Sequence, residues 1–123
     1  MDNEEIDTLI AEKAMQWTMD DKFRLFGKGT EAGAWFDKGK FITLKEGWTP
    51  SESLSQAWQA AEKMLSYVNG PDRFVVSAGK DIYGCTFQSF SGLTTVTGGF
   101  TTDEPTAALA ICKAILHELG IET

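Results

Sequence analysis

Side chains that bind metals through nitrogen or sulfur are scarce in this 123-residue sequence, which has one histidine and two cysteines. Three such residues cannot supply the four nitrogen or sulfur ligands of a structural zinc site. A single possible cysteine pair also provides no disulfide framework. The composition therefore predicts neither a zinc-stabilised nor a disulfide-stabilised fold, and we expect no cofactor.

Long hydrophobic runs and a basic, apolar leader are also missing. No stretch approaches the 18 consecutive apolar residues typical of a membrane-spanning helix. The first five residues, MDNEE, are acidic, whereas a signal peptide begins with positive charge and continues with an apolar segment. Two cysteines without a secretory signal are expected to be free thiols in a reducing compartment. We therefore expect a cytoplasmic protein with no membrane partner.

Basic residues are also fewer than acidic residues in this sequence. Eleven Lys and Arg stand against 18 Asp and Glu, which gives a formal net charge of −7. A protein that binds nucleic acid through its phosphates needs a concentrated basic surface, so we expect no nucleic-acid partner. The length and the ordinary content of 42% hydrophobic and 24% charged residues fit a single domain over residues 1–123.

Three segments have the 3.6-residue hydrophobic period of amphipathic helices. They cover about residues 3–17, 49–68 and 102–119. The second segment begins with Thr49 as a helix N-cap and Pro50 at the first helical position. We expect Trp17 of the first segment and Trp58 of the second to lie at the contacts of the helices.

Between the second and third helices the hydrophobic period changes to two, which is typical of strands. Strand-like segments cover 74–78, 82–90 and 93–100, and the short turns between them predict an antiparallel meander. A less regular stretch at about 19–47 is interpreted as a variable β insertion with strands at 23–26, 34–36 and 41–44. Together these elements predict an α/β fold of the α+β type. It is a layered sandwich in which three helices pack on one antiparallel sheet of about four to six strands.

The amino-acid sequence of three parts of the chain resembles that of a family of small bacteriophage proteins, the phage ABA sandwich domain family. The matching segments are IDTLIAEKAMQW at 6–17, WTPS at 48–51 with AWQAAEKM at 57–64, and DEPTAALAICKA at 103–114 with LGIE at 119–122. These parts cover about half of the chain and all three predicted helices. The resemblance implies an α/β layered sandwich from a phage genome and no established reaction. The stretch 19–47 is longer than the family leads us to expect.

Side chains for acid–base or nucleophilic catalysis are nearly absent. His117 is the only histidine, and a solvated side chain near the negative end of a helix dipole explains its position. Cys112 lies on the apolar stripe of the third helix, and Cys85 alternates with large apolar residues, so both are expected to be buried. A reactive cysteine needs an electropositive neighbourhood, which neither position has. We therefore expect no enzyme activity.

Two further features have structural explanations. Gly98-Gly99 either allows a ligand to approach closely or forms a bulge before the third helix, and the bulge is favoured. The acidic pairs Glu4-Glu5 and Asp103-Glu104 stand at predicted helix starts, where the helix dipole favours negative charge.

One group of aromatic and basic residues lies outside the helical stripes. Aromatic rings stack on bases, and Arg or Lys pairs with phosphates, so this composition suits a nucleotide pocket. In the alternative interpretation the aromatic residues form a second small core, and the lysines are ordinary charges on hairpin edges. The candidate ligand-binding residues are Arg24, Trp35, Lys38, Lys40, Trp48 and Arg73.

Two functional hypotheses from different classes follow. The first is a non-enzymatic phage accessory protein that binds a small anionic, nucleotide-like ligand. By analogy with small acidic phage proteins, it would sequester a host-defence nucleotide signal. Pockets shared between subunits help a small chain to enclose a ligand, so a homo-oligomer is expected. The alternative is a protein-binding module that inhibits a host factor through an acidic surface.

Overall fold

The computed structural model describes residues 1–24, 29–91 and 94–122. Its α-helices are α1 (Asn3–Leu9), α2 (Leu54–Leu65) and α3 (Ala107–Glu118). A π-helix (Ile10–Ala14) continues α1, and a 3₁₀ helix (Lys45–Gly47) follows the third strand. The strands are β1 (Thr18–Asp20), β2 (Ala34–Asp37), β3 (Lys40–Leu44), β4 (Arg73–Ala78), β5 (Tyr83–Ser91) and β6 (Thr94–Glu104).

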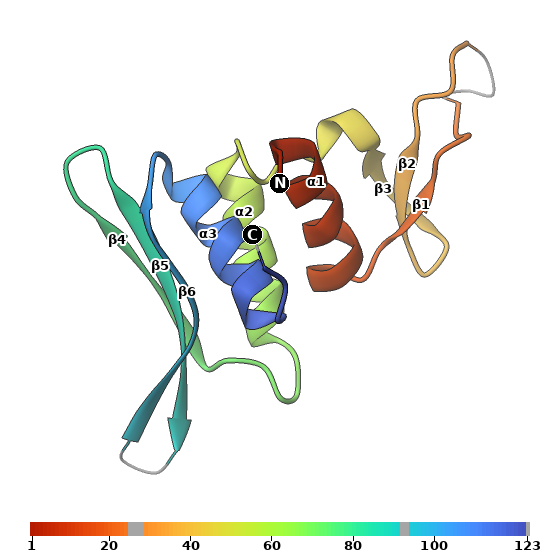
Figure 1. Ribbon diagram of the computed structural model, residues 1–123. Coiled ribbons are helices and arrows are strands. Elements are labelled where there is room, and N and C mark those ends of the chain that lie inside the picture. Colours follow the sequence, from red (N-terminus) through yellow and green to blue (C-terminus); the bar gives the residue numbers. More distant parts are fainter. Residues whose placement is uncertain (25–28, 92–93, 123) are drawn as a thin grey trace.

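The six described strands form two antiparallel sheets with the orders β1-β2-β3 and β4-β5-β6. Figure 1 shows the helices between them: α2 and α3 lie beside the β4–β6 sheet, and α1 lies between these helices and the β1–β3 sheet. The α+β class and the antiparallel pairing are therefore confirmed. The prediction of one sheet was wrong, because β1, β2 and β3 pair with one another and form a separate layer.

The first predicted helix is present, but it is shorter and less regular than expected. Asp2 caps α1 by accepting a hydrogen bond from the backbone N–H of Glu5 at 2.8 Å. After Leu9 the helix widens into the π-helix, which ends at Ala14 rather than at residue 17. Trp17 lies in the link between the π-helix and β1 and is buried, as expected.

The second helix begins later than predicted. Its N-cap is Ser53, whose hydroxyl accepts from the backbone N–H of Gln56, and Thr49 instead closes a separate turn with its carbonyl oxygen. The helix buries small residues and one methionine, namely Ala57, Ala60, Ala61 and Met64. Small side chains let α2 approach its neighbours closely, and this leaves Trp58 at the border of the layer. There it is 45% exposed and packs edge-on against Phe74 of β4, so Trp58 lies at a contact between its helix and the β4–β6 sheet, at the edge of the core.

The predicted meander is confirmed as β4, β5 and β6. β6 continues to Glu104, through residues predicted to begin the third helix, and α3 starts at Ala107 with Thr106 as its N-cap. Cys85 of β5 and Cys112 of α3 are both buried in the core, as predicted. Among the helices of the described ranges, none has the length and apolar content that crossing a membrane requires.

The two glycines of β6 allow a close approach of α3 to the sheet. A Cβ atom at Gly99 would lie 2.5 Å from the carbonyl oxygen of Ala114, and the Gly99 N–H donates to the carboxylate of Glu118. The register between β5 and β6 is irregular at the same place. The expected bulge is therefore present, and a helix makes the close approach for which we had considered a ligand.

The stretch 19–47 contains short strands, but one of the predicted strands was misplaced. The first strand is β1, which pairs with β2, while Phe23 and Arg24 lie outside the strands. Residues 25 and 26 of the predicted strand fall outside the described ranges. β2 and β3 are joined by Lys38 and Gly39, whose φ angles of +51° and +83° are those of a tight hairpin turn.

Candidate functional site

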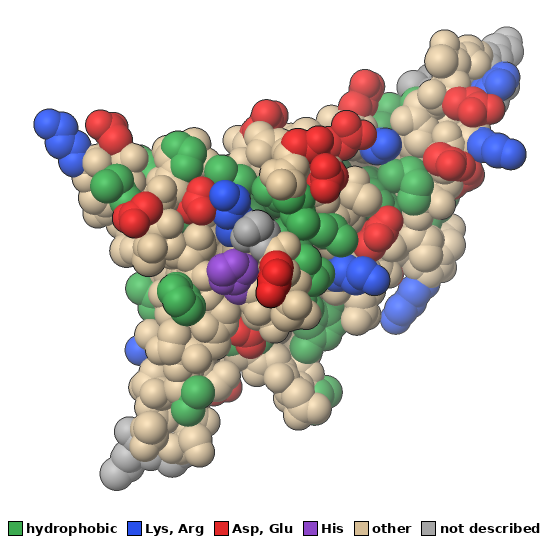
Figure 2. Space-filling view, viewed as in Figure 1, with side chains coloured by type: hydrophobic (Ala, Val, Ile, Leu, Met, Phe, Trp, Pro, Cys, Tyr) green, Lys and Arg blue, Asp and Glu red, His purple; other side chains and the backbone are tan. Residues whose placement is uncertain are grey.

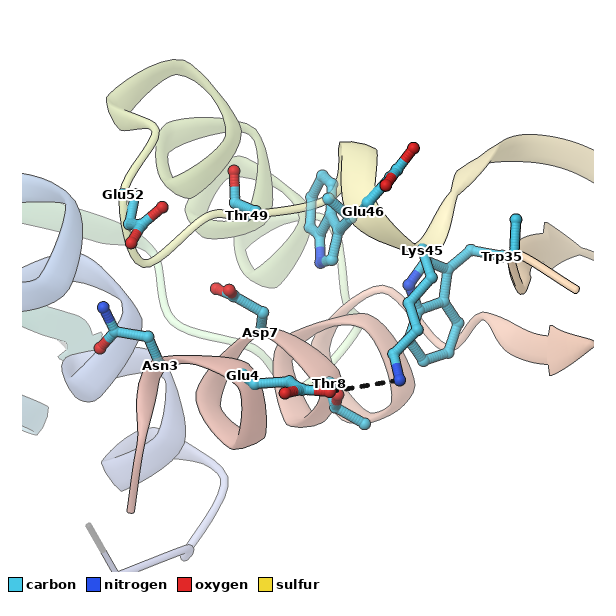
Figure 3. A pocket seen from close by; sticks show the side chains of 11 residues that line it. Asn3, Glu4, Asp7, Thr8, Trp35, Lys45, Glu46, Thr49 and Glu52 are labelled. Carbon is cyan, nitrogen blue, oxygen red and sulfur yellow. Dashed lines mark ion pairs between the residues drawn. The ribbon is translucent and has the colours of Figure 1, made fainter. Parts of the chain in front are cut away.

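A cavity of about 420 Å³ lies between α1 and the segment that joins β3 to α2 (Figure 3). Its volume is within the range of small-ligand sites, about 300–1,000 Å³. The first turns of α1, the start of β2 and residues 45–52 supply its walls. We call it the tryptophan pocket, and its main lining residues are Glu4, Asp7, Trp35, Lys45, Glu46, Trp48 and Glu52.

Side-chain hydrogen bonds fix the chain segment that forms one wall of the pocket. The Gln56 Oε1 atom accepts from the Thr49 N–H at 2.7 Å, and its Nε2 donates to the Gly47 carbonyl oxygen at 2.8 Å. On the other side, Asp7 of α1 accepts from the Ser51 N–H at 2.8 Å. The wall is therefore tied to both helices and needs no ligand to hold it in place.

Two indole rings form the apolar part of the pocket. Trp35 is 1% exposed and Trp48 is 4% exposed, and Trp48 packs edge-on against Trp17 with the ring centroids 4.6 Å apart. The Nε1 atom of Trp48 is buried, and no hydrogen-bond acceptor for it lies in the described part of the chain. Buried donors are nearly always paired in folded proteins. A residue that lines the pocket therefore carries an N–H group without an acceptor among the described residues.

Carboxylates dominate the polar part of the pocket. Those of Glu4, Asp7, Glu46 and Glu52 line it together with a single ammonium group, that of Lys45. The Lys45 Nζ atom lies 3.3 Å from a carboxylate oxygen of Glu4. Figure 2 shows acidic side chains gathered over the start of α1 and the 3₁₀ helix. This face of the protein therefore favours a positively charged group over an anion.

Asp7 is the buried member of this acidic group. Burial raises the pKa of its carboxyl above the usual value near 3.8. Hydrogen bonds from Ser51 lower the pKa, while the nearby charges of Glu52 and Glu4 raise it, and the net shift is upward. Three like charges near one cavity repel each other, and a cation that enters the cavity would relieve that repulsion.

The raised pKa of Asp7 has a measurable effect on stability. A carboxyl with a higher pKa in the folded than in the unfolded chain binds more protons when folded. The stability it contributes is therefore lost as the pH rises from about 3.8 through its folded-state pKa. Asp7→Asn keeps an acceptor for Ser51 without the charge. It should raise the Tm at pH 7 by about 3 °C and flatten the pH dependence.

Circular dichroism melts between pH 4 and pH 8 test this expectation. Glu12→Gln is the control, because Glu12 is an exposed carboxylate on the same helical segment. A lower Tm for Asp7→Asn at pH 7 would contradict the prediction, since it would mean that the charged form of Asp7 stabilises the fold.

Of the six residues predicted to bind a ligand, two lie in the tryptophan pocket. Trp35 and Trp48 line it, as described above. Lys38 and Lys40 are exposed at the β2–β3 turn and line neither this pocket nor another described one. The structure therefore brings the two predicted tryptophans together in one pocket, and the two predicted lysines lie outside it.

The two predicted arginines lie elsewhere and have other partners. Arg24 forms an exposed ion pair with Glu31, with 3.5 Å between the charged atoms. Arg73 belongs to the β4–β6 sheet, where its guanidinium group lies 4.9 Å from the ring centroid of Phe90. The six residues, all of them described, therefore do not form one common pocket.

The remaining aromatic residues of the stretch form a small cluster of their own. The ring centroids of Phe23, Phe36 and Phe41 lie 5.5–5.9 Å apart in stacked and edge-on pairs. Phe41 stays 44% exposed, so the cluster is a half-buried patch on the β1–β3 sheet. This arrangement agrees with the alternative interpretation of a second small core for these three rings.

Sequence reasoning missed the acidic residues of the pocket. Glu4 was explained by the helix dipole, and Glu52 lies within the segment 49–68 that was predicted to be a helix. Asp7 carried a usable signal, because it lies three residues before Ile10 and seven before Ala14, on the buried stripe of the helix. A charged residue on an apolar stripe is a reason to look for a buried polar site.

The two thiols are poorly suited to chemistry. Burial raises the pKa of Cys85 to about 12, and burial together with the nearby Asp7 and Cys85 raises the pKa of Cys112 as well. Thiolate is the reactive form, so burial disfavours the nucleophilic state of both side chains. Within the described ranges, no three His, Cys, Asp or Glu side chains are grouped so that they could hold a metal ion.

Comparison with known proteins identifies one family. The family model of the phage ABA sandwich domain matches residues 8–116, which is most of the chain and includes both sheets. Among curated proteins and among solved structures, no match was found.

Proposed function

Because the chain belongs to the phage ABA sandwich domain family, we propose that it is a bacteriophage accessory protein that inhibits a host factor by binding it. The observation that carries the proposal is the charge of the tryptophan pocket. Four carboxylates line the same cavity as its two indole rings, and the one lysine among the lining residues is already paired with Glu4. A surface of this charge complements a basic patch on a protein partner, speeds their association and rejects acidic partners.

The proposed partner is a protein of the infected bacterium, and the proposed place of action is the host cytoplasm. Acidic side chains continue beyond the pocket, since a neighbouring hollow of about 350 Å³ is lined by Asp2 and Glu5 as well as Glu4. Binding without chemical turnover is part of the proposal.

A small anionic ligand is the second candidate. The observation that favours it is the β2–β3 turn, where the exposed Lys38 and Lys40 lie close in the sequence to the exposed Phe41. Neither lysine takes part in an ion pair among the described residues. Two ammonium groups and an aromatic face are the groups that hold a phosphate and stack on a base. The turn is exposed, so enclosing a nucleotide there would require a second subunit, and a homo-oligomer belongs to this candidate.

The two candidate functions require ligands of opposite charge, so one binding experiment separates them. Isothermal titration calorimetry would measure binding of an arginine-rich peptide and of a cyclic dinucleotide to the wild-type protein and to two variants. We expect Glu4→Gln/Glu52→Gln to weaken peptide binding at least tenfold, because it removes two charges from the pocket. Lys38→Ala/Lys40→Ala, which removes two charges elsewhere, should leave peptide binding intact. Added salt should also weaken the peptide complex.

The opposite pattern would favour the second candidate. Dinucleotide binding that is lost with the two lysines, together with no peptide binding, would reject the main proposal. Peptide binding that is insensitive to Glu4→Gln/Glu52→Gln would also reject it, since the pocket would then not be the site.

A further inference from the structure

We infer that the tryptophan pocket binds a basic side chain together with a backbone carbonyl group of the same extended peptide segment, and that Lys45 is an internal substitute for that side chain. The inference rests on the proposed function and narrows it by naming the part of the partner that enters the pocket. It combines three observations: the acidic walls, the unpaired indole N–H and the position of Lys45.

The polar groups of the pocket require both a donor and an acceptor from a ligand. The carboxylates of Glu4, Glu46 and Glu52 accept hydrogen bonds and attract positive charge. The Nε1–H group of Trp48 can only donate, and it has no acceptor in the described chain. A simple alkyl cation satisfies the carboxylates and leaves the indole N–H unpaired. An arginine or lysine residue within a peptide satisfies both, because its side chain is a cation and its backbone carries carbonyl groups.

The indole rings supply an apolar border to the cavity beside its carboxylates. Trp35 and Trp48 both line the cavity, and at 1% and 4% exposure they present only the small parts of their rings that border it. The alkyl part of a long basic side chain can pack against this border while its charged end reaches the carboxylates. A long basic residue therefore matches the apolar and the acidic parts of the pocket together.

Lys45 already places an ammonium group at this site. Figure 3 shows its side chain extended along the pocket from the 3₁₀ helix, with its end next to Glu4 of α1. The pair is exposed on both sides, 46% for the Lys45 side chain and 76% for that of Glu4. Exposed ion pairs of this kind contribute little to stability. A partner's basic side chain can therefore displace Lys45 from Glu4 at small cost.

A matched pair of small probes tests the role of Trp48. N-acetyl-arginine N-methylamide has a guanidinium group and backbone carbonyls, whereas butylguanidine has the same cationic group on an alkyl chain without a carbonyl. We expect wild-type protein to bind the arginine probe more tightly. Trp48→Phe keeps an aromatic ring but removes the N–H donor. It should weaken binding of the arginine probe about fivefold and leave butylguanidine binding within twofold.

A second variant tests the role of Lys45. Lys45→Met should strengthen binding of both probes three- to fivefold, because it removes the competing ammonium group. Lys40→Met is the matched control, since it removes the same charge from an exposed position outside the pocket. Titration calorimetry gives the affinities, and circular dichroism confirms that each variant is folded. If Trp48→Phe unfolds, the preference of the wild-type protein for the arginine probe over butylguanidine tests the carbonyl contact, and Lys45→Met tests the ammonium site.

The outcomes distinguish this inference from the proposed function. Equal weakening of both probes by Trp48→Phe, or the same effect of Lys45→Met and Lys40→Met, would overturn the inference while peptide binding at the glutamates still stands. If neither probe nor the arginine-rich peptide binds at all, the proposed function fails together with the inference.

Discussion

Trp35→Ala should lower the free energy of unfolding by about 3–5 kcal/mol, the range for large aromatic side chains removed from a core. Trp35 is 1% exposed and belongs to the main core cluster. Trp35 and the small Ala34 are the buried residues among the described strands of the β1–β3 sheet. This indole is therefore the main side chain that joins the sheet to the rest of the protein, and its loss leaves a cavity at that junction.

The loss of stability caused by Trp35→Ala should be larger in the β1–β3 sheet than in the β4–β6 sheet. Amide hydrogen exchange should accelerate more in β1–β3 than in β4–β6, because Cys85 and Phe87 hold the second sheet in the core without help from Trp35. Urea denaturation measures the total loss. Trp58→Ala is the matched control, since that tryptophan is 45% exposed and should contribute about 1 kcal/mol. Equal acceleration in both sheets, or a smaller loss than in the control, would contradict the anchoring role of Trp35.

Elements whose signals are local in the sequence were predictable. The alternation of large apolar residues over 74–90 was enough to identify β4 and β5, and the short turns fixed their antiparallel order. The apolar stripe of the third helix placed Cys112 in the core. In these segments the period, the turn residues and the tertiary packing all favour the same structure, so local reasoning succeeds.

The start of α2 shows how tertiary contacts change the choice between two local signals. Both Thr49 and Ser53 are good N-cap residues. The segment from Thr49 to Glu52 is held away from the helix because Asp7 accepts the Ser51 N–H and Gln56 accepts the Thr49 N–H. Asp7 lies 44 residues from Ser51 in the sequence. No pattern within the second helix could reveal this bond.

The division into two sheets has the same kind of cause. From the sequence alone, the short strands of 18–44 could pair with the later meander or with one another. The hydrophobic pattern of a strand does not determine which strand it pairs with. The choice depends on where α1 and Trp35 pack, which is a property of the whole chain. The sequence pattern therefore predicts the number and type of the strands more reliably than the sheet to which each strand belongs.

Of the residues predicted to bind a ligand, the two tryptophans line the tryptophan pocket, and the charged residues that line it with them are mainly acidic rather than basic. Counting charges along residues 22–45 gives a basic neighbourhood for Trp35 and Trp48. In space, the neighbours of these rings come mainly from Glu4 and Asp7 of α1 and from Glu52 before α2. Charges that are close in sequence, such as Lys38, point elsewhere because the hairpin carries them to its exposed turn. The kind of ligand that a pocket favours follows from its spatial neighbours, and here they favour a cation.

Gly99→Ala should cost about 3 kcal/mol of the free energy of unfolding, at the upper end of the usual range for overpacking a core. The added Cβ atom would lie 2.5 Å from the Ala114 carbonyl oxygen and 2.6 Å from the Cα atom of Glu118. These are backbone atoms of α3, so the clash cannot be relieved by rotating a side chain. Either α3 moves away from the sheet, or β6 bends outward and loses its pairing with β5.

Two other glycines provide graded controls for this prediction. A Cβ at Gly98 would meet the end of the flexible Glu118 side chain, so Gly98→Ala should cost about 1 kcal/mol. At Gly79 the nearest atom would be 3.7 Å away, and Gly79→Ala should change stability by less than about 0.5 kcal/mol. Urea denaturation of the three variants should therefore rank them Gly99, Gly98, Gly79. A Gly99→Ala protein as stable as Gly79→Ala would show that α3 does not rest on β6 at this point, and the packing between helix and sheet described above would be wrong.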